Sequence, residues 1–186
     1  MISTLKSLYT AIFGVIQTIT EDWLLGLAAR LMFSSVLFLY FINSAMTKVG
    51  SGFPGSLIVE GNTYAQMFPK LFESVGFDAS KIEFVPYGII AYAGTYAEFI
   101  LPVLILVGWF TRAAAVGFIV FIAVMTYTDI TGHDAKIGGF FDRFQDAAIA
   151  DQRLLWLFPL IYLVIRGPGL ISLDAIFGRM FQREEI

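Results

Sequence analysis

The sequence predicts an all-α membrane protein: a bundle of four transmembrane helices, with an amphipathic helix at the membrane surface at each terminus. Of the 186 residues, 58% are hydrophobic and only 15% are charged, whereas a soluble domain carries about 25% charged residues. The apolar residues also gather in long segments, and a spanning helix needs about 20 of them. A small soluble domain cannot bury so large an apolar share, because its surface is large relative to its volume.

Four segments are expected to span the membrane, at about residues 23–47, 84–108, 113–128 and 147–165. They make up a predicted transmembrane domain over residues 21–168. The third segment is short, and the fourth begins with the polar run Asp151, Gln152 and Arg153. The connection at residues 109–112 is short, which predicts an antiparallel hairpin. An even number of spans places both termini on the same side of the membrane.

The two terminal segments are expected to lie at the membrane surface. In residues 1–20, apolar residues recur at helical spacing and polar residues fill the other face, which is typical of an interfacial helix. Residues 169–186 repeat the pattern, with Ser172 as a candidate N-cap. The basic residues are divided almost evenly between the two sides, so the positive-inside rule gives little direction. We place the termini in the cytoplasm.

The composition excludes several classes of function. The chain has no cysteine, which removes thiol catalysis, disulfides and cysteine-bound iron–sulfur clusters. Its net charge of −3 disfavours a nucleic-acid partner. The single histidine lies outside the predicted spans, so haem is not expected, and no flavin or metal is predicted. No motif of a serine hydrolase, a phosphate loop or a zinc protease occurs.

Arg30 and Glu98 each lie inside a predicted span. A charge at membrane depth costs at least about 2.5–3.5 kcal/mol and normally faces a partner in the bundle interior. In antiparallel helices the two residues fall at comparable depths, so we expect them to pair. The pair is either a site for a polar headgroup or a proton, or a structural ion pair that joins two helices.

Two further polar residues share faces with these charges. Ser34 lies on the stripe of the first span that begins at Arg30, and Thr95 lies on the stripe of the second that contains Glu98. Together these four residues form a candidate intramembrane ligand site. The alternative is dry packing of small residues between helices. Arg112, at the end of the hairpin, is expected to anchor the chain at the membrane face.

A second polar cluster is expected at the opposite membrane face. Its members are Lys48, Asp129, His133, Asp151 and Arg153, with Asp134 beside them. Histidine and carboxylates can bind a metal or carry protons. One histidine is a poor ligand set, so a solvated acidic loop is the simpler interpretation.

Three stretches resemble the DoxX family of small bacterial membrane proteins. They are Arg30–Phe33 followed by Asn43–Lys48, then residues 96–115 with their Glu, apolar run, Gly and Thr-Arg, and residues 167–174 with Gly-Pro-Gly and Ser-Leu-Asp. The resemblance covers residues 23–178. The chain departs from the family at Ser44-Ala45, where a glycine is usual before the lysine, and in its longer loops.

The resemblance implies a protein of the bacterial cytoplasmic membrane that is linked to quinone-dependent redox complexes. Arg30 and Glu98 are then expected to bind or protonate a quinone headgroup between the first two spans, with electrons supplied by membrane protein partners. Two alternatives remain open. One is a non-catalytic anchor or assembly subunit of a larger complex, and the other is a small-molecule transporter, which the lack of a visible inverted repeat disfavours.

Overall fold

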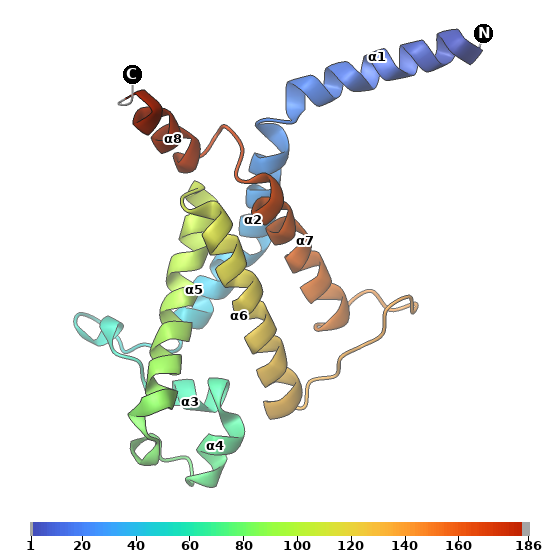
Figure 1. Ribbon diagram of the computed structural model, residues 1–186. Coiled ribbons are helices and arrows are strands. Elements are labelled where there is room, and N and C mark those ends of the chain that lie inside the picture. The colour runs from blue at the N-terminus through green and yellow to red at the C-terminus, as the bar shows by residue number, and fades with distance from the viewer. Residues whose placement is uncertain (1, 184–186) are drawn as a thin grey trace.

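The computed structural model describes residues 2–183, and all regular elements in that part of the chain are helical. They run in the order α1, α2, α3, α4, α5, α6, α7 and α8 (Figure 1), with short 3₁₀ or irregular turns between some of them. Their bounds are Ile2–Thr20, Leu24–Met46, Asn62–Met67, Pro69–Ser74, Ile89–Val107, Thr111–Gly132, Ala150–Arg166 and Leu173–Arg183.

Helices α2, α5, α6 and α7 form the bundle. Contacts join α2 to α5, α5 to α6, α6 to α7 and α7 back to α2, so the four helices close a ring. Aromatic side chains pack at its centre, where the ring of Phe118 lies 4.9 Å from that of Phe33 and 5.0 Å from that of Phe41 between centroids. The alanines Ala114 and Ala115 of α6 are buried, which lets the neighbouring backbones approach closely.

Three helical segments among the described residues are long and apolar enough to cross a membrane: α2, the stretch Phe84–Val107 that contains α5, and α6. Helix α6 extends further at both ends than the 113–128 expected from the sequence. Helix α7 has 17 residues and is therefore about 25 Å long, shorter than the ~30 Å hydrocarbon core of a bilayer. The fourth span predicted at 147–165 is therefore not among the helices that are long enough to cross a membrane.

The predicted hairpin between α5 and α6 is confirmed. Gly108 ends α5 with φ of 72°, a left-handed conformation that glycine adopts without strain. A Cβ at this position would come within 2.7 Å of Ser172 Cβ and 2.8 Å of the Arg30 guanidinium. The turn therefore needs glycine for its conformation and for its close contacts with the two other segments.

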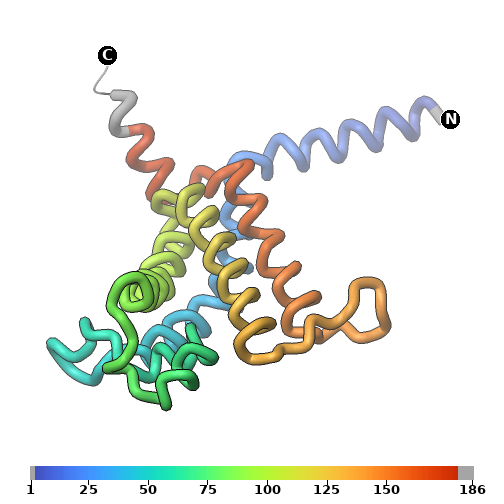
Figure 2. Tube along the Cα trace, turned by 60° about the horizontal axis from the view of Figure 1, so that its bottom comes forward, coloured from blue at the N-terminus to red at the C-terminus, as the bar shows by residue number. Residues whose placement is uncertain are grey.

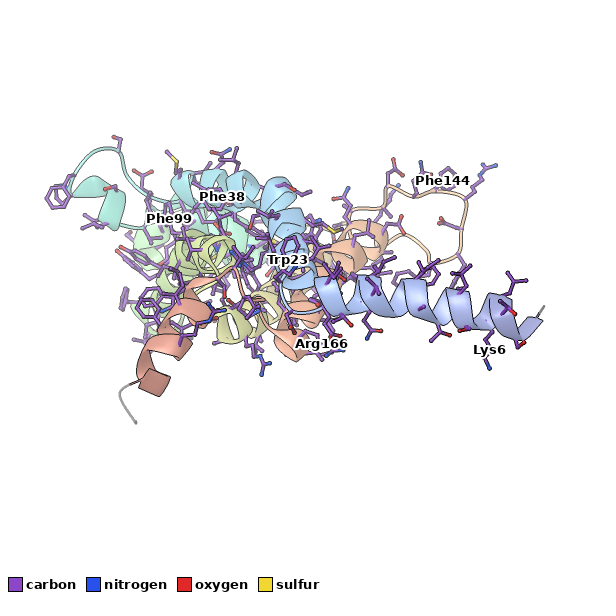
Figure 3. The ribbon with its side chains drawn as sticks, turned by 90° about the horizontal axis from the view of Figure 1, so that it is seen from above. Lys6, Trp23, Phe38, Phe99, Phe144 and Arg166 are labelled. Atoms are coloured by element: carbon purple, nitrogen blue, oxygen red, sulfur yellow. The ribbon has the colours of Figure 1, made fainter. Side chains whose placement is uncertain are left out.

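Both ends of the described chain leave the bundle at the same end (Figure 1). Helix α1 runs sideways from Trp23, where it meets the bundle, toward Lys6 at its far end (Figure 3). Its apolar side chains are exposed, from 49% at Ile12 to 62% at Leu5. Beyond Arg179, no side chain of the predicted 169–186 tail falls within the described part of the structure.

The two long connections lie at the other end of the bundle. The first carries α3 and α4, of which α3 contacts α5, and an isolated bridge pairs Val49 with Val59. The second connection, residues 133–149, extends outward between α6 and α7 (Figure 2). The bundle therefore has an end with both termini and an end with both long loops, which we call the loop end.

Candidate functional site

Arg30 of α2 binds backbone carbonyls and does not pair with Glu98. Its Nε donates to Ile105 O at 3.0 Å, Nη2 to Leu106 O at 2.6 Å and Nη1 to Ile171 O at 2.6 Å, with a longer contact to Pro168 O at 3.4 Å. The last carbonyls of a helix have no partner within it. Arg30 therefore closes the end of α5 and fixes the segment between α7 and α8 against it.

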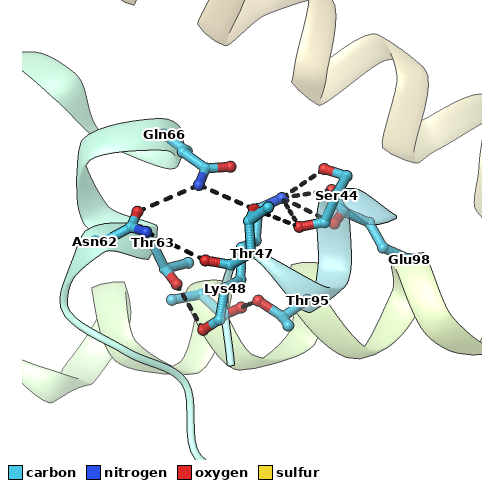
Figure 4. A network of polar contacts seen from close by, with 9 residues as sticks. Ser44, Thr47, Lys48, Asn62, Thr63, Gln66, Thr95 and Glu98 are labelled. Carbon is cyan, nitrogen blue, oxygen red and sulfur yellow. Dashed lines mark hydrogen bonds and ion pairs between the residues drawn. The ribbon is translucent and has the colours of Figure 1, made fainter. Parts of the chain in front are cut away.

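Glu98 of α5 pairs instead with Lys48, which follows the end of α2. Lys48 Nζ lies 2.8 Å from Glu98 Oε2 and 3.2 Å from Oε1. The ammonium also donates to Ser44 Oγ at 2.7 Å and to Ser44 O at 3.2 Å. Both charged side chains are buried, and Figure 4 shows the network around them. The predicted Arg30–Glu98 pair is therefore wrong, although each charge does face the interior and has partners.

The distance along the bundle explains why the expected pair does not form. Arg30 reaches Ile105, and Glu98 lies two turns earlier on α5, about 10 Å along its axis. The side chain of Lys48 folds back from the loop end along α2 and meets the carboxylate there. Lys48 itself is held by α3, because Thr63 Oγ1 donates to its backbone carbonyl at 3.1 Å. The pair thus joins α2, α5 and the first loop.

Ser34 and Thr95 differ in their hydrogen bonding. Thr95 is fully buried, and its hydroxyl donates to Ala91 O at 2.8 Å. Ser34 is 7% exposed, and its hydroxyl has no hydrogen-bond partner within the described part of the chain. It lines a cavity of about 340 Å³ between α2 and α5, which we call the α2/α5 groove. The groove is lined by Leu31, Ser34, Ser35, Phe38, Leu39 and Leu106.

The five residues of the predicted loop-end cluster do not form a single site. Arg153 pairs with Asp129 at 2.6 Å, which joins α7 to α6, whereas Lys48 belongs to the Glu98 pair. His133 Nε2 lies 2.9 Å from Gln66 O. Asp151 Oδ2 accepts from the Ala147 amide at 3.0 Å. These residues therefore join different pairs of helices and loops.

Two further polar residues, Arg112 and Asp174, lie at the end of the bundle that carries both termini. Arg112, the predicted membrane-face anchor, is exposed, and its Nη2 lies 3.5 Å from Ile165 O. Asp174 of α8, which the sequence marked only as part of the Ser-Leu-Asp stretch, accepts from the Phe110 amide at 2.7 Å and the Thr111 amide at 2.9 Å. It therefore caps the start of α6 from a segment far away in the chain.

A family model described as DoxX matches residues 25–133, which is more than half of the chain. The chain belongs to the DoxX family. Within this DoxX protein the matched region runs from the start of α2 to the end of α6, so it includes Arg30 and the Lys48–Glu98 pair. Arg153 and Asp174 lie outside it. No curated protein and no solved structure shows significant similarity to the chain.

Membership in the DoxX family and the apolar helices together identify a multi-pass membrane protein. The long apolar helices of the DoxX region contact the lipid bilayer with their exposed faces, where Val36, Val120 and Ile100 are 64%, 57% and 51% exposed. In a bilayer, hydrocarbon offers the buried charges of the bundle no other partners. Their contacts within the protein therefore stabilise the bundle.

Proposed function

We propose that this DoxX protein is a membrane subunit of a quinone-linked redox complex in the bacterial cytoplasmic membrane. Its partners in the membrane supply the electrons, and its own bundle binds the quinone headgroup. The proposal is supported by the family and by one observation in the bundle, the buried hydroxyl of Ser34 without a partner beside an apolar groove. A quinone presents carbonyl acceptors on a ring with an apolar tail, which matches these features.

The quinone ring lies in the α2/α5 groove, and a ring carbonyl accepts from the Ser34 hydroxyl. Leu31, Phe38 and Leu39 provide apolar walls, and the tail extends into lipid. Arg30 lies one helical turn from Ser34 on the same face of α2, so its positive charge favours negative charge on the ring. Lys48 and Glu98 act at a distance in this proposal, because they hold α2 and α5 at the separation that forms the groove.

The α2/α5 groove can be tested with two neighbouring serines. Ser34→Ala removes the unpartnered hydroxyl, while Ser35→Ala removes a hydroxyl that already donates to Met32 O at 3.0 Å. The measurement is the quinone extracted per chain from purified protein, together with cross-linking by a photoreactive ubiquinone analogue. Loss of one hydrogen bond predicts about a three- to tenfold weaker affinity for Ser34→Ala. Equal quinone content in the two variants would refute the site.

We further propose a topology in which α7 is a fourth span and the termini are cytoplasmic. Helix α7 packs between α2 and α6, and tilting or local thinning of the bilayer can accommodate a short span. Helices α1 and α8 then lie in the membrane interface, which suits the exposed apolar residues of α1. The transmembrane domain keeps the 21–168 bounds expected from the sequence.

Single cysteines test this topology without background, since the chain contains none. Ser7→Cys and Gly178→Cys should react with an impermeant maleimide only after the membrane is permeabilised. Ser51→Cys and Asp142→Cys should react with it in intact cells. The same accessibility for Asp142→Cys and Gly178→Cys would show that α7 does not cross. A reversed pattern at all four positions would place the termini outside.

A second candidate function is a non-catalytic anchor or assembly subunit. It is favoured by the hydrogen bonds of Arg30 and Glu98, which bind groups of the chain itself, and by the long exposed helix α1. Blue-native electrophoresis of membranes after mild extraction distinguishes the two functions. An anchor retains its partners in the Ser34→Ala variant and loses them when α1 is removed, whether or not quinone is bound.

A further inference from the structure

A larger cavity, of about 570 Å³, lies between α2 and α7. We call it the α2/α7 groove. It lies on a different side of α2 from the α2/α5 groove, because its walls include Phe33, Val36 and Leu37 in place of Leu31, Ser34 and Phe38. Its volume is in the range of small-molecule sites, about 300–1,000 Å³.

The groove has a polar end and an apolar end. Tyr40 of α2 and Gln152 and Arg153 of α7 line it near the loop end of the bundle. Met32 and Pro159 line it further toward the middle of the two helices. From Tyr40 to Met32 the groove follows α2 for about 12 Å. An amphiphile that binds here has its headgroup at the loop end and its tail toward the bilayer centre, as a lipid of that leaflet does.

Arg153 gives the polar end an unsatisfied donor. The residue is 8% exposed, its Nη2 binds Asp129 at 2.6 Å and its Nη1 lies 3.4 Å from Thr126 Oγ1. Its guanidinium lies 4.8 Å from the Trp156 ring centroid. Its Nε has no hydrogen-bond partner among the residues that the structure describes. A buried donor without a partner is costly, and Arg153 lines this end of the groove, so an acceptor that a ligand brings to the guanidinium stabilises the site.

The charges at the polar end favour a headgroup without net charge. Asp129 already balances the positive charge of Arg153, and Asp151 adds a carboxylate in the first turn of α7. An anionic headgroup therefore gains little attraction here. A zwitterionic headgroup complements the end, since its ester and phosphate oxygens accept hydrogen bonds and its ammonium favours nearby carboxylates.

The walls of the groove suit an acyl chain that lies along the helices. Val36 and Leu155, on facing helices, are 64% and 60% exposed, and Met32 is 53% exposed. The groove is thus open to the membrane along its length and does not enclose a ligand on both faces. A flexible chain that lies parallel to the helices fits this shape, with one side on protein and the other in lipid.

We propose that the α2/α7 groove is a specific site for one zwitterionic phospholipid of the phosphatidylethanolamine class, from the leaflet at the loop end. The glycerol ester region accepts from the Arg153 guanidinium, with Tyr40 and Gln152 beside it. One acyl chain lies between α2 and α7. The proposal is independent of the quinone proposal, because it uses a different groove and different residues.

Val36→Trp fills the groove without touching the Arg153–Asp129 pair, so the bundle should still fold. Val120→Trp is the matched control, because Val120 of α6 is 57% exposed and lines neither groove. The full chain is released from micelles that contain equal amounts of phosphatidylethanolamine, phosphatidylglycerol and ubiquinone-2, and retained molecules are counted by native mass spectrometry. Wild type and Val120→Trp should retain one phosphatidylethanolamine, and Val36→Trp should retain at least tenfold less.

The other outcomes overturn the proposal. Preferential retention of phosphatidylglycerol would contradict the charge argument, and retention of ubiquinone-2 that Val36→Trp abolishes would make this the quinone groove. Equal retention of phosphatidylethanolamine by both tryptophan variants would place the lipid elsewhere. Ser34→Ala provides the link to the proposed function, since it should leave phosphatidylethanolamine retention unchanged whether or not it weakens quinone binding.

Discussion

Lys48 Nζ lies 2.8 Å from Glu98 Oε2, and the two side chains are 4% and 5% exposed. This is a fully buried ion pair between the end of α2 and the middle of α5. Ser44 satisfies further donors of the ammonium, so the charges are paired and hydrogen-bonded. Removing one partner of such a pair is far more harmful than removing both.

Lys48→Met should lower the free energy of unfolding by about 3–5 kcal/mol, because it leaves the Glu98 carboxylate buried and unpaired. The double variant Lys48→Met/Glu98→Leu should recover most of this loss. Thermal unfolding in detergent, followed by circular dichroism, measures both effects. Glu98→Leu alone completes the cycle, and a double variant whose loss equals the losses of Lys48→Met and Glu98→Leu added together would contradict a direct pairing.

Arg30→Lys should destabilise the end of α5 even though it keeps the charge. A compact ammonium cannot reproduce the guanidinium fork that binds Ile105, Leu106 and Ile171 together. The expected loss is about 1.5–3 kcal/mol, with faster amide exchange at Gly167 and in residues 169–172. Arg112→Lys is the control, since Arg112 is exposed and its contact with Ile165 O is long, at 3.5 Å. Similar exchange in the two variants would argue against this bridging role for Arg30.

Asp174→Asn should weaken the cap on α6. The carboxylate accepts from two backbone amides, Phe110 and Thr111, and an N-terminal cap contributes about 0.5–2 kcal/mol. Hydrogen exchange should quicken at residues 110–114. Asp142→Asn, which alters an exposed loop carboxylate that accepts from Phe144 N, should leave those amides unchanged. Unaltered exchange in Asp174→Asn would show that another group caps the helix.

Gly108→Ala should be strongly destabilising. The new Cβ meets Ser172 at 2.7 Å and Arg30 at 2.8 Å, and alanine is strained at a φ of 72°. Gly14→Ala is the opposite case, because Gly14 lies in α1 and a Cβ added there would meet no described atom within 4 Å beyond the backbone of its own helix. Alanine there should stabilise the helix by about 0.5–1 kcal/mol. Equal melting temperatures for the two variants would show that the α5–α6 turn adjusts freely.

Much of the bundle could be predicted from local patterns, and its contacts could not. Apolar length located α2, α5 and α6, and the short run at residues 109–112 located the hairpin. The position of Arg30 and Glu98 inside apolar spans was also readable, which is why both were expected to face the interior, but the comparable depths that predicted their pairing were wrong. Their partners depend on the axial register of α2 against α5 and on how far a lysine side chain can fold back along its helix. The spacing of residues within each helix determines neither.

Among the remaining site residues, contacts within one helix could also be predicted from the sequence, and contacts between distant segments could not. Ser44 and Lys48 share a face at a separation of four, so their contact was readable from helical spacing. Asp174 reaches residues 110 and 111 across 63 or more positions of sequence, and only the Ser-Leu-Asp stretch marked it. The loop-end residues were expected to form one cluster because they lie at the same membrane face. That face is wide enough for them to make several separate contacts instead.

The bridge made by Arg30 also bears on the order in which the protein matures in the membrane. Its acceptors on α5 are synthesised some 75 residues later, and Ile171 some 141 residues later. While the chain is being made, α2 therefore carries an intramembrane charge whose partners do not yet exist, which disfavours its release into lipid. The set of acceptors is complete only when the segment between α7 and α8 has been made, because Ile171 supplies the last of the short contacts, at 2.6 Å.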